Sequence, residues 1–214
     1  LAIHGKIFLK QIKEFINYSP EGGEYSPQRI PGTDDISAVR LDNTGLQRFY
    51  KYDINTGNSK EIIRNLEVAY PLWASNKLLF SAVIGEKSLE LVKSDLKNKT
   101  NVLLEKKIGR SLHCIPGTNS ISFISKKKPQ WEIFSIDITT LTINKITNLD
   151  DNYEDIAWIS KDVVLQAKKN QLLQFNIKTD SVWKELINKD SLQIQNISRI
   201  TISPDRTKIA IVGE

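Results

Sequence analysis

The chain has 214 residues, 40% of them hydrophobic and 26% charged, and its net charge is +5. This composition argues against disorder, and because no apolar run approaches the roughly 18 residues that cross a bilayer, we predict no transmembrane segment. The lysines are scattered, with the densest run at 126–128 before Pro129, where we predict a hairpin tip; a nucleic-acid surface gathers its basic residues on one face, so we expect no nucleic-acid partner.

A hairpin signal recurs along the chain. An apolar stretch ends in Asp or Asn, then Ile or Leu, a polar turn and a second apolar stretch, centred on Asp53, Asp95, Asp137 and Asn176, which are separated by 42, 42 and 39 residues. A carboxylate or amide oxygen at a strand end accepts hydrogen bonds from the backbone N–H groups of the turn that follows. Gly57 can supply a positive φ in the first copy. The flanking residues favour a pleated sheet.

A second motif lies about twenty residues upstream of each hairpin. It is a strand, a tight turn with Pro, Gly, Asp, Asn or Ser, and a more apolar strand, at 24–41, 68–84, 110–125, 153–167 and 199–213. One repeat is therefore four antiparallel strands in about 42 residues, which predicts an all-β fold, a β-propeller of four-stranded blades. A β-sandwich would not produce a hairpin at so regular a spacing.

We predict a single propeller domain over 1–214. Its blades are expected at about 24–67, 68–109, 110–152 and 153–196, with 197–214 closing a fifth blade together with 1–23. Between Leu9 and Gln11 there is no room for the turn that the other copies have, so six blades are expected if a segment near the N-terminus is missing. The chain starts at Leu1 and contains no methionine, which indicates a processed or partial chain.

Motifs of catalysis are missing from the sequence. It contains no G-x-S-x-G, no glycine-rich phosphate loop, no C-x-x-C pair and no H-E-x-x-H. We therefore predict a protein that is not an enzyme. The single cysteine, Cys114, cannot form an internal disulfide and is expected to be a small buried hydrophobe between Leu112 and Ile115.

Candidate binding residues occupy the start of each first strand, which in a propeller approaches the central channel. The aligned positions are Glu24, Glu67, Gly109, Tyr153 and Asn196. With their neighbours they give the candidate channel residues Glu24, Tyr25, Glu67, Arg110, His113, Glu154 and Asp155. Their carboxylates could hold a divalent cation such as calcium, as in metal-assisted hydrolysis by lactonase-like propellers. The other interpretation is that they are solvated or cap turns, with no cofactor, and that His113 is hydrogen-bonded between blades.

The tryptophans divide into two pairs. Trp73 and Trp158 occupy similar places in the first strands of their repeats, where we predict packing between neighbouring blades. Trp131 and Trp183 fall in outer strands. An exposed aromatic side chain at a channel rim would instead indicate contact with a peptide or glycan.

The segment ISPDRTKIAIVG resembles the repeat signature of TolB-type propeller proteins. Ser203, Pro204, Asp205 and Lys208 match it, while Arg206 stands where that family has glycine. The stretches EYSPQRIPGT and IGRSLHCIPGTNSISF are similar to TolB-like propeller-repeat proteins of Bacteroidetes, so that the resemblance spans 15–214. It implies a six-bladed ring, export to the periplasm or cell surface, and a role in protein–protein contact, but no catalytic residues.

Three functions follow from these observations. The first is a non-catalytic, exported, monomeric scaffold that binds a protein partner or ligand. The second is a metal-assisted hydrolase that uses the channel carboxylates. The third is the regulatory propeller of a larger peptidase.

Overall fold

A computed structural model describes residues 23–187 and 194–213. Every regular element in these two ranges is a β-strand. No helix in them could span a membrane. The strands predicted in 1–22, which would complete the fifth blade, lie outside the described residues.

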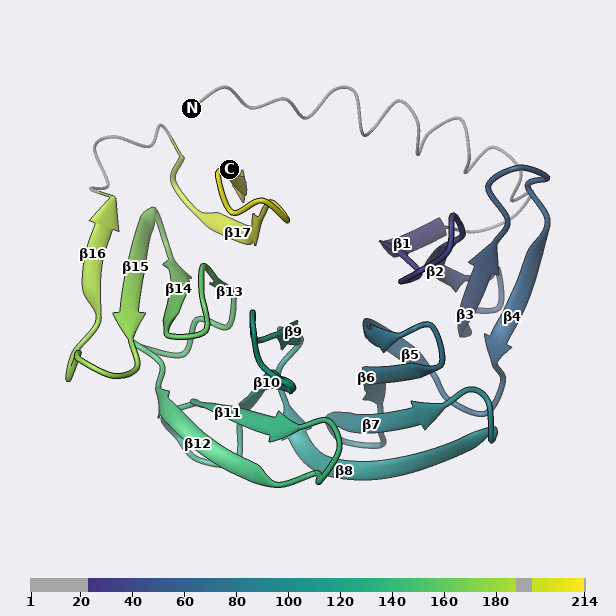
Figure 1. Ribbon diagram of the computed structural model, residues 1–214, viewed down its shortest axis with the longest axis horizontal. Coiled ribbons are helices and arrows are strands. Elements are labelled where there is room, and N and C mark those ends of the chain that lie inside the picture. The colour runs from purple at the N-terminus through teal and green to yellow at the C-terminus, as the bar shows by residue number, and fades with distance from the viewer. Residues whose placement is uncertain (1–22, 188–193, 214) are drawn as a thin grey trace. The chain divides into compact units, whose positions relative to one another are not determined.

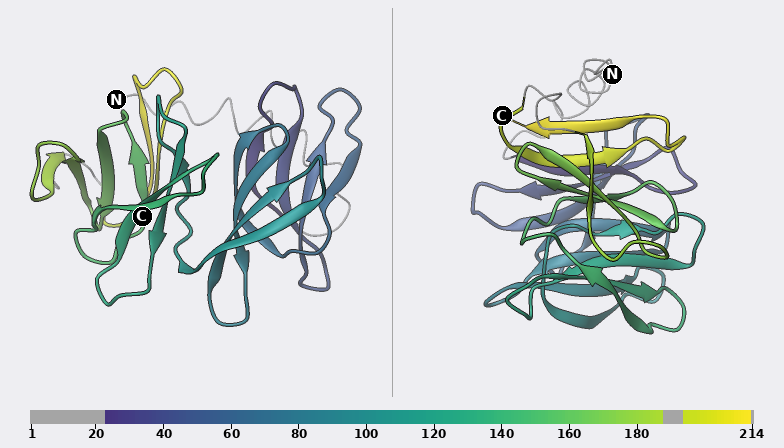
Figure 2. Two further views of the ribbon diagram at one scale, coloured as in Figure 1. Left: turned by 60° about the horizontal axis from the view of Figure 1, so that its bottom comes forward. Right: turned by 90° about the vertical axis from the view of Figure 1, so that its left-hand side faces the viewer.

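The strands follow one another as antiparallel meanders (Figures 1 and 2). The first sheet has the order β1-β2-β3-β4, formed by β1 (Gly23–Arg29), β2 (Ile36–Leu41), β3 (Gln47–Tyr52) and β4 (Ser59–Ile63). The next meander comprises β5 (Val68–Ser75), β6 (Leu78–Ile84), β7 (Leu89–Asp95) and β8 (Thr100–Ile108). Ile108 at the end of β8 also pairs with Ser125 of β10 (Ser120–Ser125). The blade bounds at 24–67 and 68–109 stay predictions.

The same arrangement recurs in the second half. One meander comprises β9 (His113–Cys114), β10 (Ser120–Ser125), β11 (Glu132–Asp137) and β12 (Ile143–Asn148). Another has β13 (Ile156–Trp158), β14 (Val163–Lys168), β15 (Gln171–Asn176) and β16 (Lys184–Ile187). The last pair is β17 (Ile197–Ile202) and β18 (Ile209–Gly213). The blade bounds at 110–152 and 153–196, and the half-blade at 197–214, stay predictions.

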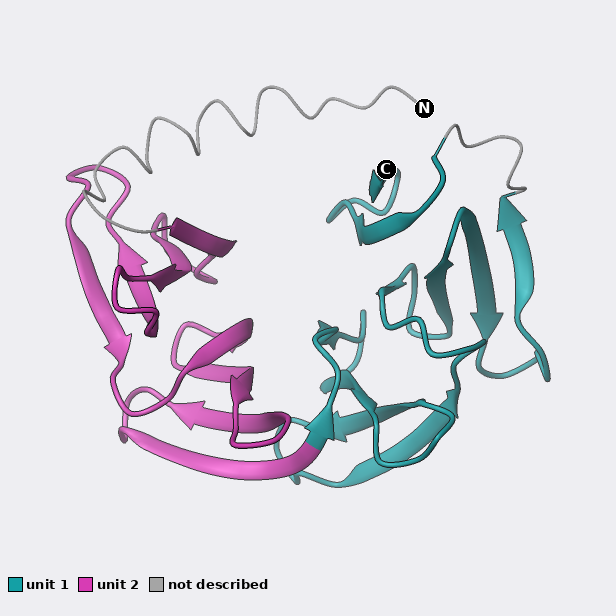
Figure 3. Cartoon of the chain, turned by 180° about the vertical axis from the view of Figure 1, so that it is seen from behind, with its two compact units in different colours: residues 1, 107–214 teal, residues 2–106 magenta. Residues whose placement is uncertain are grey.

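The chain divides into two compact units, with the boundary between Lys106 and Lys107 (Figure 3). Unit 2 holds β1–β7 and most of β8, and unit 1 holds β9–β18. Each unit is described by itself below. That the whole chain forms a single domain stays a prediction.

The predicted hairpin turns are confirmed. The Oδ1 atom of Asp53 accepts hydrogen bonds from the N–H groups of Asn55 and Thr56 at 2.8 and 3.0 Å. Asp95, Asp137 and Asn176 accept the corresponding bonds in the later copies. Four residues after each Asp the chain is left-handed, with φ of 73° at Gly57, 54° at Lys99 and 60° at Leu141. The turn geometry therefore persists even where glycine is lost, since the capping Asp is kept.

Hydrophobic cores lie where neighbouring sheets pack together. In unit 2, Phe49 and Val39 of the first sheet pack with Trp73 and Leu79 of the second. Trp73 is 6% exposed, and its Nε1 donates to Ser37 Oγ on β2 at 2.8 Å. In unit 1, Trp158 is 5% exposed and donates to Ser122 Oγ on β10 at 2.8 Å. The predicted role of both tryptophans, packing between blades, is confirmed.

One prediction about the core is wrong. Cys114 is exposed, although Leu112 and Ile115 on either side of it are buried. Its strand, β9, has only two residues, paired with Ser122 and Ile121. Over so short a strand the alternation of inward and outward side chains is not maintained, and apolar neighbours do not imply burial.

Candidate functional site

The candidate residues fall into two groups, one in each unit. Glu24 and Tyr25 lie on β1 and Glu67 immediately precedes β5, all in unit 2. In unit 1, Arg110 precedes β9, His113 lies on β9, and Glu154 and Asp155 precede β13. All of them are at or beside the start of a first strand, as the repeat alignment predicts. That they surround one channel stays a prediction.

In unit 1 the structure brings together Arg110, Glu154 and Asp155. Arg110 Nη2 donates to Asp155 Oδ2 at 2.6 Å, and its backbone N–H donates to Glu154 Oε2 at 2.9 Å. Arg110 Nε lies 3.7 Å from Glu154 Oε1. These contacts connect the segment before β9 to the segment before β13. The bonded residues are separated by 44 positions in one case and 45 in the other. Charge-assisted bonds of this kind are stronger than neutral ones and fix the geometry of both strand ends.

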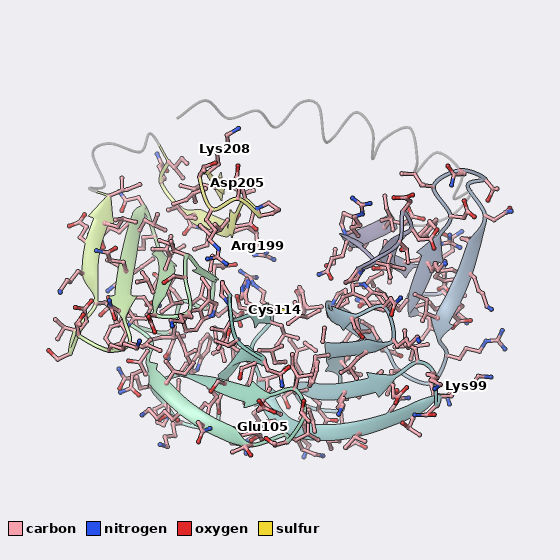
Figure 4. All side chains as sticks on the ribbon, in the orientation of Figure 1. Lys99, Glu105, Cys114, Arg199, Asp205 and Lys208 are labelled. Atoms are coloured by element: carbon pink, nitrogen blue, oxygen red, sulfur yellow. The ribbon has the colours of Figure 1, made fainter. Side chains whose placement is uncertain are left out.

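Two further cations complete this cluster, and sequence reasoning missed both. Lys126 Nζ lies 2.9 Å from Glu154 Oε2, and Arg199 Nη1 on β17 lies 3.6 Å from Asp155 Oδ1 (Figure 4). Lys126 belongs to the predicted hairpin tip; it follows β10 directly and its N–H donates to the C=O of Lys107 at 2.7 Å, so only the tertiary structure could have shown that it reaches Glu154. Arg199 opens the last first-strand motif, as Arg110 opens the third, and that parallel is the signal that could have found it. We call Arg110, Lys126, Glu154, Asp155 and Arg199 the unit 1 ion-pair cluster.

Gly109 makes the cluster sterically feasible. A Cβ atom at this position would lie 2.3 Å from Glu154 Oε2, and 3.2 Å from Ile124 Cβ. Only a residue without a side chain lets the carboxylate approach the backbone N–H of Arg110 so closely. Gly109, one of the aligned positions without a carboxylate, thus accommodates the carboxylate of Glu154 from the next repeat.

The electrostatics of the cluster favour ion pairing over metal binding. It contains three cations and two carboxylates, and the side chains of Glu154 and Asp155 are only 15% and 14% exposed. Burial raises the pKa of Asp155, against the opposing effect of Arg110. A hard cation needs several oxygen ligands with free lone pairs, and here the oxygens already accept from Arg and Lys. Within the described ranges, no group of three His, Cys, Asp or Glu residues could hold a metal ion.

His113 is part of a polar connection between sheets. Its Nε2 and Ser111 Oγ share a hydrogen bond of 3.0 Å, and Ser111 Oγ also accepts from the N–H of Ile156 on β13 at 3.4 Å. Burial lowers the pKa of His113 to about 4, so the ring is neutral near pH 7. The bond of His113 lies within its own repeat and Ser111 carries the connection to β13, so that His113 itself is hydrogen-bonded between blades stays a prediction.

In unit 2 Glu24 is also paired. Its side chain is 4% exposed, its Oε1 lies 3.4 Å from Arg40 Nε, and it accepts a hydrogen bond from Tyr52 Oη at 3.2 Å. Burial raises the pKa of Tyr52 to about 12, so the phenol stays a donor. Glu67 is exposed. Glu24 therefore resembles Glu154 and Asp155 in being neutralised by an arginine from its own unit.

Tyr25 and Glu67 are the exposed candidates, and Tyr25 is 55% exposed. It lies on β1, which pairs only with β2 among the described strands. The register of that pair shifts between Tyr25 and Gln28, and Ser26 has a φ of 52°. A bulge with a residue in the left-handed region re-aims the neighbouring side chains and is common beside binding sites.

The TolB-like signature is a turn in this structure. Asp205 Oδ1 accepts a 2.5 Å hydrogen bond from Ser203 Oγ and one of 3.1 Å from the N–H of Thr207 (Figure 4). These bonds lower the pKa of Asp205 to about 2. Arg206 adopts the positive φ, 60°, at the position where the signature has glycine. The motif closes the β17–β18 hairpin and supplies no site.

Comparison with known proteins gives likeness of structure alone. No model of a protein family matches the chain, and no curated protein matches it by sequence. It is similar to TolB from Acinetobacter baumannii, with a TM-score of 0.66 and 16% identity over 94% of this chain and 50% of the TolB chain. It is also similar to oligogalacturonate lyase in complex with manganese, with a TM-score of 0.63 and 12% identity over 90% of this chain and 62% of the lyase. A chain of a nidogen/laminin complex gives a TM-score of 0.62 and 8% identity, with coverages of 91% and 73%.

These likenesses show the fold, which is a β-propeller of four-stranded antiparallel blades, as the repeat predicts. The chain spans about half the length of the TolB chain. No family match supports the narrower resemblance to proteins of Bacteroidetes. The similar structures include an enzyme, the lyase, and a member of a protein complex, so the fold by itself is compatible with catalysis and with binding.

Proposed function

We propose that this protein is a non-catalytic propeller scaffold that binds a protein partner. We also propose that it is exported to the periplasm or cell surface, on the ground of the TolB-like repeat signature at Ser203, Pro204, Asp205 and Lys208. The observation that carries the scaffold function is the ion pairing of the first-strand carboxylates. Glu24, Glu154 and Asp155, the acids best placed for chemistry, are each held by arginine or lysine.

Such pairing suits a rigid binding surface better than catalysis. A general base or a metal ligand must offer a lone pair to the substrate or ion. In the unit 1 ion-pair cluster, these lone pairs accept bonds that join three successive sheets of the unit. Of the two exposed candidates, Glu67 and Tyr25, Tyr25 suits a protein interface, because tyrosine offers a large apolar ring and a polar tip and is enriched in such interfaces.

Photocrosslinking at Tyr25 tests the binding function directly. The photoreactive residue p-benzoylphenylalanine replaces Tyr25 in the cells that produce the protein, which are then irradiated. We expect a discrete crosslinked species of higher mass that contains one protein partner, because the exposed ring would contact it. Mass spectrometry of the purified species checks this.

The matched control places the same residue at Val182, which is 63% exposed on the β15–β16 connection of unit 1. We expect no discrete species there. The proposal is contradicted if both positions give the same products, or if Tyr25 gives none while the protein is intact and exported.

Divalent cations test the metal-assisted hydrolase, the alternative from sequence. We expect that calcium or manganese, added in excess to metal-free protein, leaves Tm unchanged, because the carboxylates that would bind it already pair with Arg110, Lys126 and Arg40. Thermal unfolding followed by circular dichroism measures this. A rise of Tm that disappears in Glu154→Gln would favour the hydrolase instead, and sodium chloride at the same ionic strength controls for salt.

A further inference from the structure

Unit 2 contains a cavity of about 840 Å³ beside β4. This volume is within the range of roughly 300–1,000 Å³ that ligand-binding pockets have. Its lining comes from β3, β4, the end of β5 and the turns after β1, β5 and β7, all in the same unit. None of the residues in the unit 1 ion-pair cluster takes part, and neither does Tyr25.

The cavity runs along a strand edge. Six consecutive residues, 60–65, line it. The first four of them, 60–63, belong to β4, whose pairing with β3 shifts register between Glu61 and Ile63, and Arg64 and Asn65 follow the strand. β4 is the last strand of its sheet and, among the described strands, pairs only with β3. Its outer N–H and C=O groups are therefore free to pair with another extended chain.

The charge of the lining is positive. It has four cations, Lys51, Lys60, Arg64 and Lys99, against two carboxylates, Glu61 and Asp95. Both carboxylates are already occupied. Glu61 lies 3.5 Å from Arg48 Nη1 and 3.7 Å from Arg64 Nε, while the N–H groups and the amide of the following turn hold Asp95 and lower its pKa.

Two of the cations have no acidic partner. Lys60 and Lys99 are exposed, and neither forms an ion pair with any residue in 23–187 or 194–213. Lys60 is on β4, and Lys99 is in the β7–β8 turn (Figure 4). An acidic ligand in the cavity would supply the missing counter-charges.

The rest of the lining offers polar and apolar contacts. Asn65, Asn76 and Asn101 are exposed and their amides form no side-chain hydrogen bond within the described ranges. Ile62, Leu96 and the edge of Trp73 give an apolar floor. An amide can donate to and accept from a peptide backbone, and an apolar floor takes an aliphatic side chain.

We propose that this cavity binds an extended acidic peptide segment of a partner protein, which adds as a strand to the outer edge of β4. Acidic side chains of the segment pair with Lys60 and Lys99, and aliphatic side chains rest on Ile62 and Leu96. This proposal rests on the proposed protein-binding function and names a second contact surface, separate from Tyr25.

Fluorescence anisotropy with a labelled peptide tests the proposal. The probe is a peptide of about eight residues in which glutamate alternates with valine, a pattern that favours an extended strand. We expect saturable binding that weakens as the salt concentration rises from about 0.05 to about 0.3 M, because salt screens the attraction between the lysine ammonium groups and the glutamate carboxylates of the peptide. A peptide with lysine in place of glutamate is expected not to bind.

Variants locate the site. The double variant Lys60→Gln and Lys99→Asn should raise Kd about tenfold; asparagine is chosen because residue 99 has a φ of 54°. The control, Lys87→Gln and Lys161→Gln, removes the same charge from exposed lysines outside the cavity and should leave Kd unchanged. Circular dichroism verifies that both variants are folded.

Backbone methylation separates strand addition from simple charge attraction. N-methylation of alternate residues of the probe removes the N–H groups that would pair with β4 and should abolish binding. The proposal is overturned if the methylated or lysine peptide binds as well as the acidic one, if both double variants weaken binding equally, or if the acidic peptide does not bind. Crosslinking at Tyr25 uses a different surface and the natural partner, so its failure is distinguishable from failure here.

Discussion

Replacing Trp158 with alanine is expected to lower the free energy of unfolding by about 3–5 kcal/mol, which is the range for truncating a buried aromatic side chain. Trp158 is 5% exposed and lies in a core cluster with Ile124, Val164 and Phe175, contributed by successive sheets of unit 1. Its removal would leave a cavity at the contact between two sheets. Because Trp158 packs against side chains of both sheets, the loss should weaken the apolar part of their contact.

The indole also forms a buried hydrogen bond to Ser122. Trp158→Phe keeps most of the volume but leaves Ser122 Oγ without its donor, and Ser122→Ala leaves the indole N–H without its acceptor. An unsatisfied buried group costs about 1–3 kcal/mol, so each single variant should be destabilised, while the double variant should lose less than the sum of the two.

Urea unfolding followed by circular dichroism measures these differences. Trp131→Ala is the control: Trp131 is partly exposed, and Lys126 Nζ lies 3.9 Å from its ring centroid. We expect Trp131→Ala to lower the free energy of unfolding much less than Trp158→Ala does. Equal costs for the two would show that the contact between the sheets does not depend on Trp158.

Local sequence patterns predicted the fold because the turns that define the repeat are formed by interactions between residues close together in the sequence. Asp53, Asp95 and Asp137 bond to N–H groups two and three residues away, so their role can be recognised without knowledge of the tertiary structure. Trp73 and Trp158 were predictable for the same reason, since alignment of the repeats places both on a first strand. Each donates to a serine 36 residues earlier, which is about one repeat.

The role of the candidate site could not be predicted in the same way. Glu154 and Asp155 were identified by position, but whether they bind a cation or an arginine depends on partners 28 to 45 residues away. The exposure of Cys114 depends on the length of β9, which its apolar neighbours do not reveal. The cavity beside β4 is lined by lysines from β3, β4 and the β7–β8 turn that look scattered in the sequence.

Removal of Arg110 should show that the unit 1 ion-pair cluster is held by charge compensation. In Arg110→Met, Asp155 keeps its burial but loses the 2.6 Å bond to the guanidinium, with only Arg199 remaining at 3.6 Å. Loss of one partner of a fully buried pair costs about 3–5 kcal/mol. Since Arg110 and Asp155 are 29% and 14% exposed, water screens part of this interaction, and we expect a loss of about 2–3 kcal/mol at pH 7.

The pH dependence distinguishes lost charge compensation from lost packing. Burial already raises the pKa of Asp155 above its value in the unfolded chain, and without Arg110 the pKa should rise further. A raised pKa means that the folded state favours the neutral form of the Asp155 carboxyl. The contribution of this carboxyl to the free energy of unfolding is therefore present below the unfolded pKa of about 3.9 and is lost as pH rises through the folded pKa. The cost of Arg110→Met, measured against the parent protein at each pH by urea unfolding, should therefore be largest near pH 7 and shrink toward pH 4.

A second substitution completes the argument. Arg110→Met combined with Asp155→Asn removes the uncompensated charge but keeps its shape, so the double variant should recover most of the stability lost at pH 7 and show little pH dependence in this range. If the loss were due to packing of the arginine stem, methionine would already replace most of it, and neither lower pH nor Asp155→Asn would restore stability. Recovery by both routes would establish that Arg110 compensates the charge of Asp155, the pairing on which the proposed scaffold function depends.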